Sequence, residues 1–339
     1  MQQTILAPME GVIDGPMRAR LTGIGGYSRC VTEFVRVTNV LLPERVFIRL
    51  CPELLGDGCT PSGTPVYVQL LGSDADALAK NAVRACELGA PGVDLNFGCP
   101  AKTVNNSMGG SILLREPPLV ASIVQTVVDA VGGRVPVTAK IRLGYDDIFS
   151  LGSIVDGIFN AGVTELAIHA RTKFDGYKPP AYWQHVRPIM NPYRAQRSVI
   201  NGEIWTVSDA DNARQTSTCK HVMLGRGALS APDLALRIAK NTQDSAPMPW
   251  VKLLDDVLDQ FLTSDCNSPR HVGNRTKQWL AYLKRNYPEA NALFQRIRTM
   301  HNTSDIANAF EVHRRQDLTE SVPVMPHAPA QSVASNRLT

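Results

Sequence analysis

The sequence lacks the features that mark membrane, secreted and metal-binding proteins. No apolar run in its 339 residues approaches the roughly 18 residues that a membrane-spanning helix needs. The N-terminus has neither a basic segment nor a long apolar core, so no signal peptide is expected. The seven cysteines are odd in number, scattered and without a CxxC pair, which argues against a disulfide framework and a zinc site. We therefore expect a cytoplasmic protein with no metal centre and no membrane partner.

The sequence also lacks the G-x-G-x-x-G motif that usually follows the first strand of an open, doubly wound sheet. Its first part contains instead short apolar runs that alternate with helical patterns. The runs are rich in Val, Ile and Leu without strict alternation, which is typical of strands buried on both faces. Eight such strands are expected, at residues 4–7, 29–32, 66–70, 92–95, 137–141, 165–168, 198–200 and 221–224.

Glycines separate several of the expected helices from the strands that follow. At Gly89, Gly132 and Gly162 a helical pattern ends and the next apolar run begins soon after. The order strand, helix, glycine, strand is typical of βα units whose helices end in a glycine cap. Eight units of this kind predict an α/β fold, a (β/α)₈ TIM barrel, with an open doubly wound sheet as the alternative.

The strand signals stop after Pro232, and the rest of the chain has a different character. We expect a small C-terminal bundle of about four helices. The predicted division is a barrel domain over 1–240, a linker over 241–249, a helical domain over 250–315 and a disordered tail over 316–339.

Positive charge concentrates in the helical segment. Between Arg270 and Arg298 seven Lys and Arg residues stand against one acid, Glu289, so the segment carries +6 while the whole chain carries +4. This distribution predicts a polyanion-binding surface. A solvated helix face is the simpler alternative.

The barrel prediction places chemistry at the C-terminal ends of the strands. All eight expected strand ends carry polar, charged or glycine residues. The seventh and eighth end in Asn-Gly-Glu (201–203) and Gly-Arg-Gly (225–227), and the loops at these two positions commonly hold phosphate in barrels. Glycine lets backbone N–H groups approach the anion and an arginine adds charge. Ordinary left-handed turns are the alternative.

Three side chains near other strand ends predict a flavin. Lys140 ends the fifth strand, where a buried cation is costly unless it meets an anion, and the N1 locus of a reduced flavin supplies one. An ion pair with a barrel carboxylate is the alternative. His169 shares the barrel mouth with Lys140, which favours a ligand-binding role over a core role. Gln69 donates and accepts through one side chain and suits the edge of a flavin pyrimidine.

Cys99 follows the fourth strand in Asp-Leu-Asn-Phe-Gly-Cys-Pro (94–100). A free thiol with a pKa of about 8.5 is mostly protonated at neutral pH, so it serves as a general acid without any shift of its pKa. A nucleophilic thiolate would need a stabilising base, and no Cys–His pair is evident. The alternative is a buried structural cysteine.

These motifs together resemble the bacterial tRNA-dihydrouridine synthases. The matching stretches are 7–11 (APMEG), 32–33 (TE), 69–72 (QLLG), 94–100 (DLNFGCP), 140–144 (KIRLG), 169–172 (HART), 201–203 (NGE) and 225–227 (GRG). Further stretches look like subclass C, the uridine-16 enzymes: 32–36 (TEFVR), 51–54 (CPEL), 60–64 (TPSGT) and 277–280 (KQWL).

The resemblance implies reduction of the uracil C5–C6 bond in the D loop of tRNA. Hydride would come from FMN, which NADPH or NADH would reduce, and the proton would come from the catalytic Cys99. A monomer is expected. The FMN-lining residues implied are Pro8, Met9, Glu10, Gln69, Lys140, His169, Asn201, Gly202, Glu203, Gly225 and Arg226. The residues implied to contact uracil or tRNA are Arg36, Asn96, Arg142, Tyr177, Arg275, Lys277 and Tyr282.

Two other functions remain open from the residues themselves. A small-molecule flavin reductase or dihydropyrimidine-type dehydrogenase would use the same barrel, but it would not need the basic helical segment. A non-catalytic RNA-binding protein would not need Cys99, Lys140 or the phosphate turns.

Overall fold

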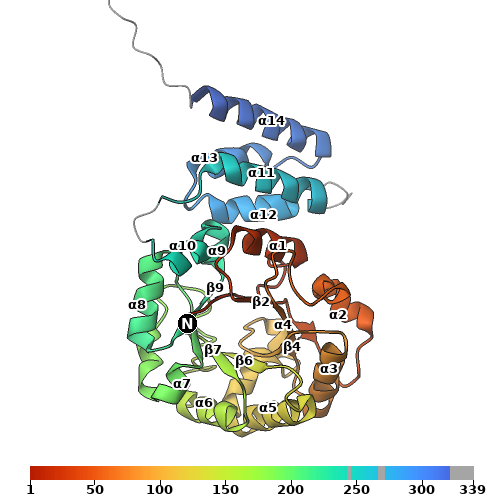
Figure 1. The fold of residues 1–339 in the computed structure, drawn as a ribbon, viewed down its shortest axis with the longest axis vertical. Coiled ribbons are helices and arrows are strands. Elements are labelled where there is room, and N and C mark those ends of the chain that lie inside the picture. The colour runs from red at the N-terminus through yellow and green to blue at the C-terminus, as the bar shows by residue number, and fades with distance from the viewer. Residues whose placement is uncertain (243–245, 266–271, 321–339) are drawn as a thin grey trace, which may run out of the picture.

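A closed parallel β-barrel forms the centre of the computed structural model, which describes residues 1–242, 246–265 and 272–320 (Figure 1). All strand pairs are parallel, and the circle closes because β1 pairs with both β2 and β9. The strands are β1 (Thr4–Leu6), β2 (Arg29–Val31), β3 (Val35–Arg36), β4 (Val66–Leu71), β5 (Val93–Phe97), β6 (Val137–Arg142), β7 (Glu165–His169), β8 (Ser198–Asn201) and β9 (His221–Leu224).

The predicted (β/α)₈ TIM barrel is confirmed, since each of the eight expected strands overlaps an observed one. The sequence did not predict β3, which follows β2 after a short break and pairs with the same neighbour, β4. A strand of two residues is too short to leave a periodic signal in the sequence.

The helices of the barrel part form a ring around the strands, except for the short helix at Lys102–Asn105, which lies inside that ring (Figure 1). They are α1 (Gly15–Ile24), α2 (Glu44–Leu50), α3 (Ala75–Glu87), α4 (Lys102–Asn105), α5 (Pro117–Val131), α6 (Leu151–Asn160), α7 (Pro192–Ala195), α8 (Val207–Ser217), α9 (Arg226–Ser230) and α10 (Leu234–Lys240). Single turns lie between them: η1 (Pro52–Leu55), η2 (Gly110–Arg115), η3 (Trp183–His185) and η4 (Arg187–Ile189).

Local sequence sets the ends of these helices. The Asp74 side chain caps α3 by accepting a hydrogen bond from the backbone N–H of Ala77 at 2.9 Å. Thr206 and Asp209 form a reciprocal capping box at the start of α8. Helix α5 begins with two prolines and ends at Gly132, whose φ of 59° is left-handed. These signals explain why the sequence pattern placed the helices well.

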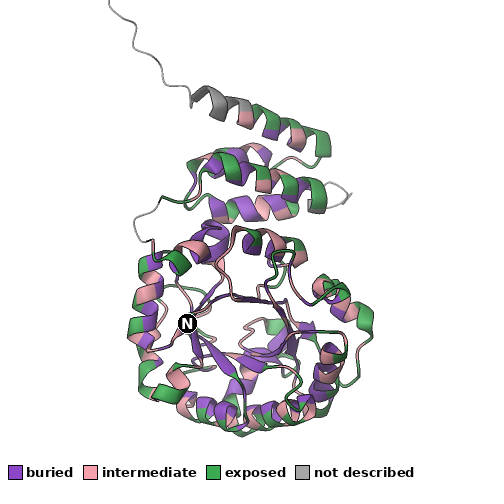
Figure 2. Ribbon diagram, in the orientation of Figure 1, coloured by how far each residue is buried: buried purple, intermediate pink, exposed green. Residues whose placement is uncertain are grey.

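The main hydrophobic core lies between the barrel and the helix ring. Figure 2 shows the strands largely buried and the outward faces of the helices exposed. On β5, Val93, Leu95 and Phe97 belong to this core. Because strand side chains alternate, Asp94 and Asn96 therefore face the barrel interior. The same alternation brings polar side chains of neighbouring strands together inside the barrel.

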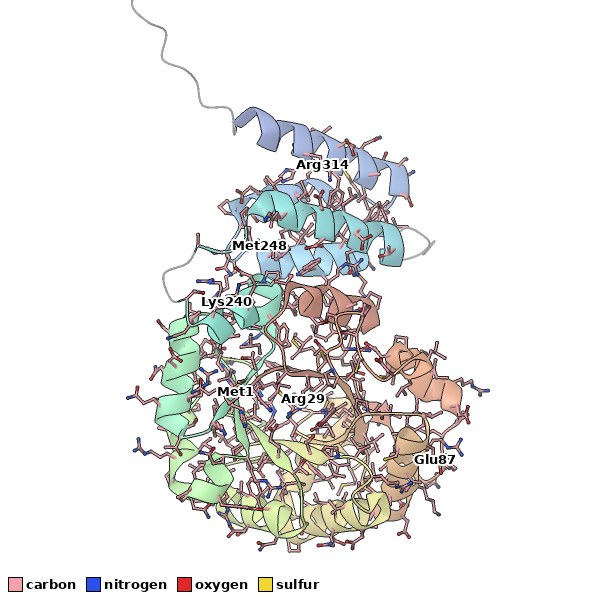
Figure 3. The ribbon with its side chains drawn as sticks, in the orientation of Figure 1. Met1, Arg29, Glu87, Lys240, Met248 and Arg314 are labelled. Carbon is pink, nitrogen blue, oxygen red and sulfur yellow. The ribbon has the colours of Figure 1, made fainter. Side chains whose placement is uncertain are left out.

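An ion pair fills the barrel interior at the N-terminal ends of the strands. Arg29, at the start of β2, pairs with Glu165, at the start of β7, and its guanidinium lies 5.0 Å from the Tyr67 ring centre. Figure 3 shows Arg29 on the inner side of the barrel. The open end is therefore the C-terminal one.

Four helices follow the barrel and stack against one side of it (Figure 1). They are α11 (Trp250–Gln260), extended by the π-helical turn η5 (Phe261–Asp265), α12 (Asn274–Leu283), α13 (Pro288–Ile297) and α14 (Thr303–Glu320). Helix α12 packs on α9, where Trp279 donates a hydrogen bond to the Leu229 carbonyl at 3.2 Å and Asn286 donates to the Ser230 carbonyl at 2.8 Å. The predicted C-terminal helical bundle is present.

The junction between the two parts includes Lys240 and Met248, labelled in Figure 3. The Met248 N–H donates to Asp233 at 2.9 Å, which ties the start of the helical part to the barrel. Helix α14 continues to Glu320, past residue 316 where the tail is expected to begin. No proline or glycine occurs between Thr303 and Pro323. Residues 321–339 lie outside the described part, and the domain limits stay predictions.

No helix within the described ranges is both long and apolar enough to cross a membrane.

Candidate active site

A cavity of about 590 Å³ opens at the C-terminal ends of the barrel strands. Most of the predicted site residues line it, and they come from strands on all sides of the barrel and from α12. The predicted residues in its lining are Pro8, Met9, Glu10, Gln69, Asn96, Cys99, Lys140, Arg142, His169, Tyr177, Asn201, Gly202, Glu203, Gly225, Arg226 and Tyr282. Their individual roles stay predictions, but the fold brings them to one place.

The turn that carries Cys99 is held by hydrogen bonds on both sides. The Asn96 side-chain oxygen accepts from the backbone N–H groups of Gly98 at 2.9 Å and Cys99 at 3.0 Å. The Cys99 carbonyl accepts from the Ser111 hydroxyl at 2.9 Å and from the Asn105 amide at 3.0 Å. The thiol therefore sits on a rigid turn at the tip of β5.

The glycine-rich segment after Cys99 is explained by close packing against this turn. Gly110 has a φ of 67°, and a Cβ atom there would lie 2.8 Å from the Cys99 carbonyl oxygen. A side chain at this position would meet both a strained backbone and a clash.

The Cys99 thiol is kept protonated by its surroundings. Burial raises its pKa above the usual thiol value, and a hydrogen bond from the backbone of Ala101 opposes this only in part. Within the described ranges no hydrogen bond joins the thiol to a histidine. The environment therefore favours a proton donor over a thiolate nucleophile.

Lys140 presents a cation to the cavity without a carboxylate partner. It lies beside Asn96 in the register of β5 and β6, and no ion pair involves it among the residues that the structure describes. Burial, and then the positive charge of Arg142, lower its pKa to about 8. The nearby charge of Asp94 opposes this lowering in part. The ammonium favours an anionic or electron-rich ligand.

His169 is neutral in this site. Arg171, which can only donate, lies with its guanidinium nitrogen 3.2 Å from Nε2 of His169, so this ring nitrogen accepts and Nδ1 carries the hydrogen. Burial, followed by the charges of Arg142 and Lys140, lowers the pKa of His169 well below its usual value. The imidazole therefore offers one N–H donor and no charge.

Glu203 orients two arginines at the cavity wall. Its Oε1 accepts from Arg171 at 2.6 Å and from Arg226 at 2.8 Å, and its Oε2 accepts from the Trp205 indole at 3.0 Å. Burial opposes ionisation, but the bonds from Trp205 and Arg171 outweigh it and lower the pKa of Glu203. The carboxylate is thus engaged with protein groups, which positions Arg226 at the mouth.

The two predicted phosphate turns leave no room for side chains. A Cβ on Gly202 would lie 3.0 Å from the His169 ring, and one on Gly225 would lie 3.3 Å from the Met9 sulfur. Gly202 also has a left-handed φ of 114°. These positions therefore bring bare backbone to the cavity wall.

Arg142, in the cavity lining, connects two loops by hydrogen bonds. It donates to the carbonyls of Gly98 at 2.8 Å, Thr172 at 2.9 Å and Gly176 at 2.9 Å. Its guanidinium also lies 5.2 Å from the Tyr177 ring centre, and Arg226 lies 5.6 Å from the same ring. Tyr177 is 56% exposed and so presents its ring at the mouth between two arginines.

Three predicted tRNA contacts lie outside the cavity lining, and each donates to a main-chain carbonyl. Arg36 bonds to the Thr103 carbonyl at 2.9 Å and to the Ser107 hydroxyl. Arg275 bonds to the Gly11 carbonyl and pairs with Asp14 at 3.6 Å. Lys277 bonds to the Met300 carbonyl. Their contacts with tRNA stay predictions, and Arg270 lies outside the described residues.

The sequence prediction missed Trp205, which links the barrel to the helical part. Arg285, which follows the end of α12, lies over its indole with the guanidinium 4.0 Å from the ring centre, and Arg226 lies 5.3 Å from it. Two arginines from distant segments therefore meet on one tryptophan beside the cavity. The one sequence signal for Trp205 was its position two residues after the 201–203 motif.

Comparison with known proteins agrees with this geometry. The family model described as "Dihydrouridine synthase (Dus)" matches residues 5–320. The tRNA-dihydrouridine(16) synthase of Shewanella oneidensis is 49% identical over 312 residues, covering 91% of this chain and 97% of the relative. That of Pseudomonas putida is 48% identical, covering 87% and 92%.

Solved structures share the fold at low sequence identity. A histamine dehydrogenase of Rhizobium sp. 4-9 aligns over 94% of this chain and 62% of its own, with a TM-score of 0.54 and 14% identity. A variant of NCR from Zymomonas mobilis aligns over 72% and 89%, with a TM-score of 0.50 and 14% identity. With the family model covering nearly the whole described structure, the chain belongs to the dihydrouridine synthase family.

Proposed function

We propose that this protein reduces the C5–C6 double bond of uridine 16 in the D loop of tRNA, with FMN as its cofactor and NADPH as the electron donor. Relatives that are 43–49% identical are named tRNA-dihydrouridine(16) synthase. The observation that carries the proposal is that the Cys99 thiol, whose pKa is raised by burial, and Lys140, which forms no ion pair with any described residue, line one cavity.

The groups around the cavity fit FMN. Lys140 offers charge for an electron-rich ring nitrogen, and Gln69 offers an amide for the pyrimidine edge. Gly202 and Gly225 bring bare backbone to the cavity wall, and Arg226 adds a positive charge for a phosphate. Bound FMN supplies the hydride that the reduction of uracil requires.

Cys99 completes the reduction by transferring its Sγ proton to C5 of the uracil while C6 receives the hydride. The resulting thiolate takes a proton from solvent before the next turnover. Lys140 stabilises negative charge that accumulates on the reduced ring system. The rigid turn around Cys99 holds the thiol in position, which lowers the entropy cost of the proton transfer.

The target base must leave the tRNA fold to reach a barrel mouth. Tyr177 and Tyr282 line that mouth and offer rings for stacking. We assign the helical part to tRNA binding, with Arg285 at the junction and further cations on its surface. The same RNA-facing surface is ordered by Arg36, Arg275 and Lys277, which donate hydrogen bonds to its main-chain carbonyls.

Comparison of tRNA with free uridine tests the proposal. The purified holoenzyme, reduced with NADPH, is mixed with unmodified tRNA or with free uridine, and dihydrouridine is measured. We expect efficient reduction of tRNA only. A preference for free uridine would instead point to a small-molecule reductase, and a purified protein without flavin colour would point to a non-catalytic RNA-binding role.

A further inference from the structure

A chain of hydrogen bonds runs through the barrel interior to the Cys99 turn. Gln69, Asp94 and Thr138 are direct neighbours in the register of β4, β5 and β6, so their side chains meet inside the barrel. Thr138 donates to Oδ1 of Asp94 at 2.6 Å, and Gln69 donates to Oδ2 of Asp94 at 2.7 Å. Gln69 in turn accepts from Asn96 at 2.7 Å.

The groups at the two ends of this chain of hydrogen bonds fix the orientation of the two side-chain amides between them. At the upper end, the backbone N–H groups of Gly98 and Cys99 can only donate, so the Asn96 oxygen faces them. The Asn96 amide nitrogen therefore faces Gln69, whose oxygen must turn toward it. The Gln69 nitrogen is then left pointing at the lower end, where the Asp94 carboxylate accepts.

The same geometry decides what Gln69 and Asn96 present to the cavity that both line. The Asn96 oxygen already accepts two bonds, so its one uncommitted group is an N–H. Gln69 likewise keeps a second N–H on the nitrogen that bonds Asp94. An N–H donor suits a carbonyl oxygen, and uracil and the flavin pyrimidine both carry carbonyls.

We propose that Asp94 is a positioning residue for the reduction: through Gln69 and Asn96 it fixes the direction of two cavity-lining amides and the backbone of the Cys99 turn. Asp94 is 2% exposed and touches neither the mouth nor the thiol, so its hydrogen bonds reach the Cys99 turn through the other two. Its charge also raises the pKa of Lys140, an effect that Asp94→Asn and Asp94→Leu both remove. The proposal rests on the proposed function for its link to uridine reduction, whereas the effect on the Cys99 turn is independent of it.

Removal of the acceptor at position 94 would release the chain. With no acceptor facing it, the Gln69 amide is free to rotate by half a turn, which would point its nitrogen at the nitrogen of Asn96. Two N–H donors then face each other, and the hydrogen bond between Gln69 and Asn96 is lost. Asn96 is no longer anchored to Gln69, so it no longer fixes the backbone of Cys99 that it bonds.

The experiment compares three variants of the full-length holoenzyme. Asp94→Leu keeps the branching of the side chain and removes the acceptor, whereas Asp94→Asn keeps an oxygen for Gln69 and offers an amide to the Thr138 hydroxyl. Glu165→Gln is the matched control, because it removes another buried barrel carboxylate that bonds Arg29 outside this chain of bonds. Flavin content and unfolding midpoint are recorded for each.

Two readouts separate positioning from a general structural role. The first is the single-turnover oxidation of reduced enzyme by tRNA, which we expect to be about 10- to 100-fold slower in Asp94→Leu and close to the parent rate in the other two variants. The second is the midpoint pH of Cys99 alkylation by iodoacetamide, followed on the Cys99 peptide. Release of the Cys99 turn should move the thiolate away from the Ala101 backbone N–H and raise this midpoint by about 0.5 pH unit or more in Asp94→Leu.

The outcomes are distinguishable. If Asp94→Leu keeps the parent alkylation midpoint and single-turnover rate, or if Asp94→Asn is impaired as strongly as Asp94→Leu, the positioning role is refuted. If the parent enzyme is not oxidised by tRNA, the proposed function fails while the alkylation result still tests the chain of bonds. If Asp94→Leu does not fold, Gln69→Met breaks the same chain one bond later, and an unchanged alkylation midpoint there overturns the proposal.

Discussion

Replacing Gly110 by alanine should disturb the Cys99 turn directly. The left-handed φ of 67° costs an L-residue about 1–2 kcal/mol. The new Cβ would also lie 2.8 Å from the Cys99 carbonyl oxygen and 3.0 Å from the Cys99 Cβ, and such overpacking costs about 1–3 kcal/mol. We expect the two effects together to lower the free energy of unfolding by about 2–5 kcal/mol.

Gly133→Ala provides a matched control for the backbone effect. Gly133 has a φ of 76°, and a Cβ there would meet nothing within 4 Å. This control should lose only about 1–2 kcal/mol and keep full activity. Denaturant unfolding and single-turnover oxidation of reduced enzyme by tRNA are measured for both variants, and only Gly110→Ala should show slower oxidation. Equal losses of stability and parent-like oxidation in both variants would refute the packing of Gly110 on the catalytic turn.

Three further predictions concern charge and proton transfer. Lys140→Met should make the midpoint potential of bound flavin more negative in spectroelectrochemical titration, because a cation that stabilises the reduced form is lost; an unchanged potential would contradict this. The raised pKa of Cys99 predicts a single-turnover rate that is level through neutral pH and falls only at alkaline pH, as the proton donor is lost; a rate that rises with pH would indicate a thiolate mechanism. Arg275→Ala should weaken tRNA binding and reduce the slope of affinity against salt by about one unit with flavin content intact, and an equal slope would show that Arg275 meets no phosphate.

The sequence predicted the barrel well because its strands are short segments, rich in apolar residues and largely buried. The helix ends at Gly132 and at the Thr206 capping box are equally local signals. Strand β3 was missed because it has two residues. A tail was expected from residue 316 because the composition there is polar, whereas α14 continues to Glu320 in a segment that contains no helix breaker.

The location of the candidate site followed from the barrel, since the ends of all parallel strands meet at one rim. The pairing of its side chains did not follow, because an arginine or an amide finds its partners only through register and tertiary contacts. Glu203 lines the cavity, and the pairing of its carboxylate with Arg171 and Arg226 became visible only in the structure. The bonds from Asp94 to Asn96 likewise depend on the register of β4, β5 and β6.

The most direct test of the account measures dihydrouridine at position 16 of tRNA in a strain from which the gene for this chain is deleted. The strain is complemented with the parent gene or with Cys99→Ala, and each D-loop uridine is mapped. We predict that position 16 is unmodified in the deletion strain, restored by the parent and not restored by Cys99→Ala, although that variant still binds flavin. Full modification of position 16 in the deletion strain, or equal restoration by Cys99→Ala, would contradict the central claim.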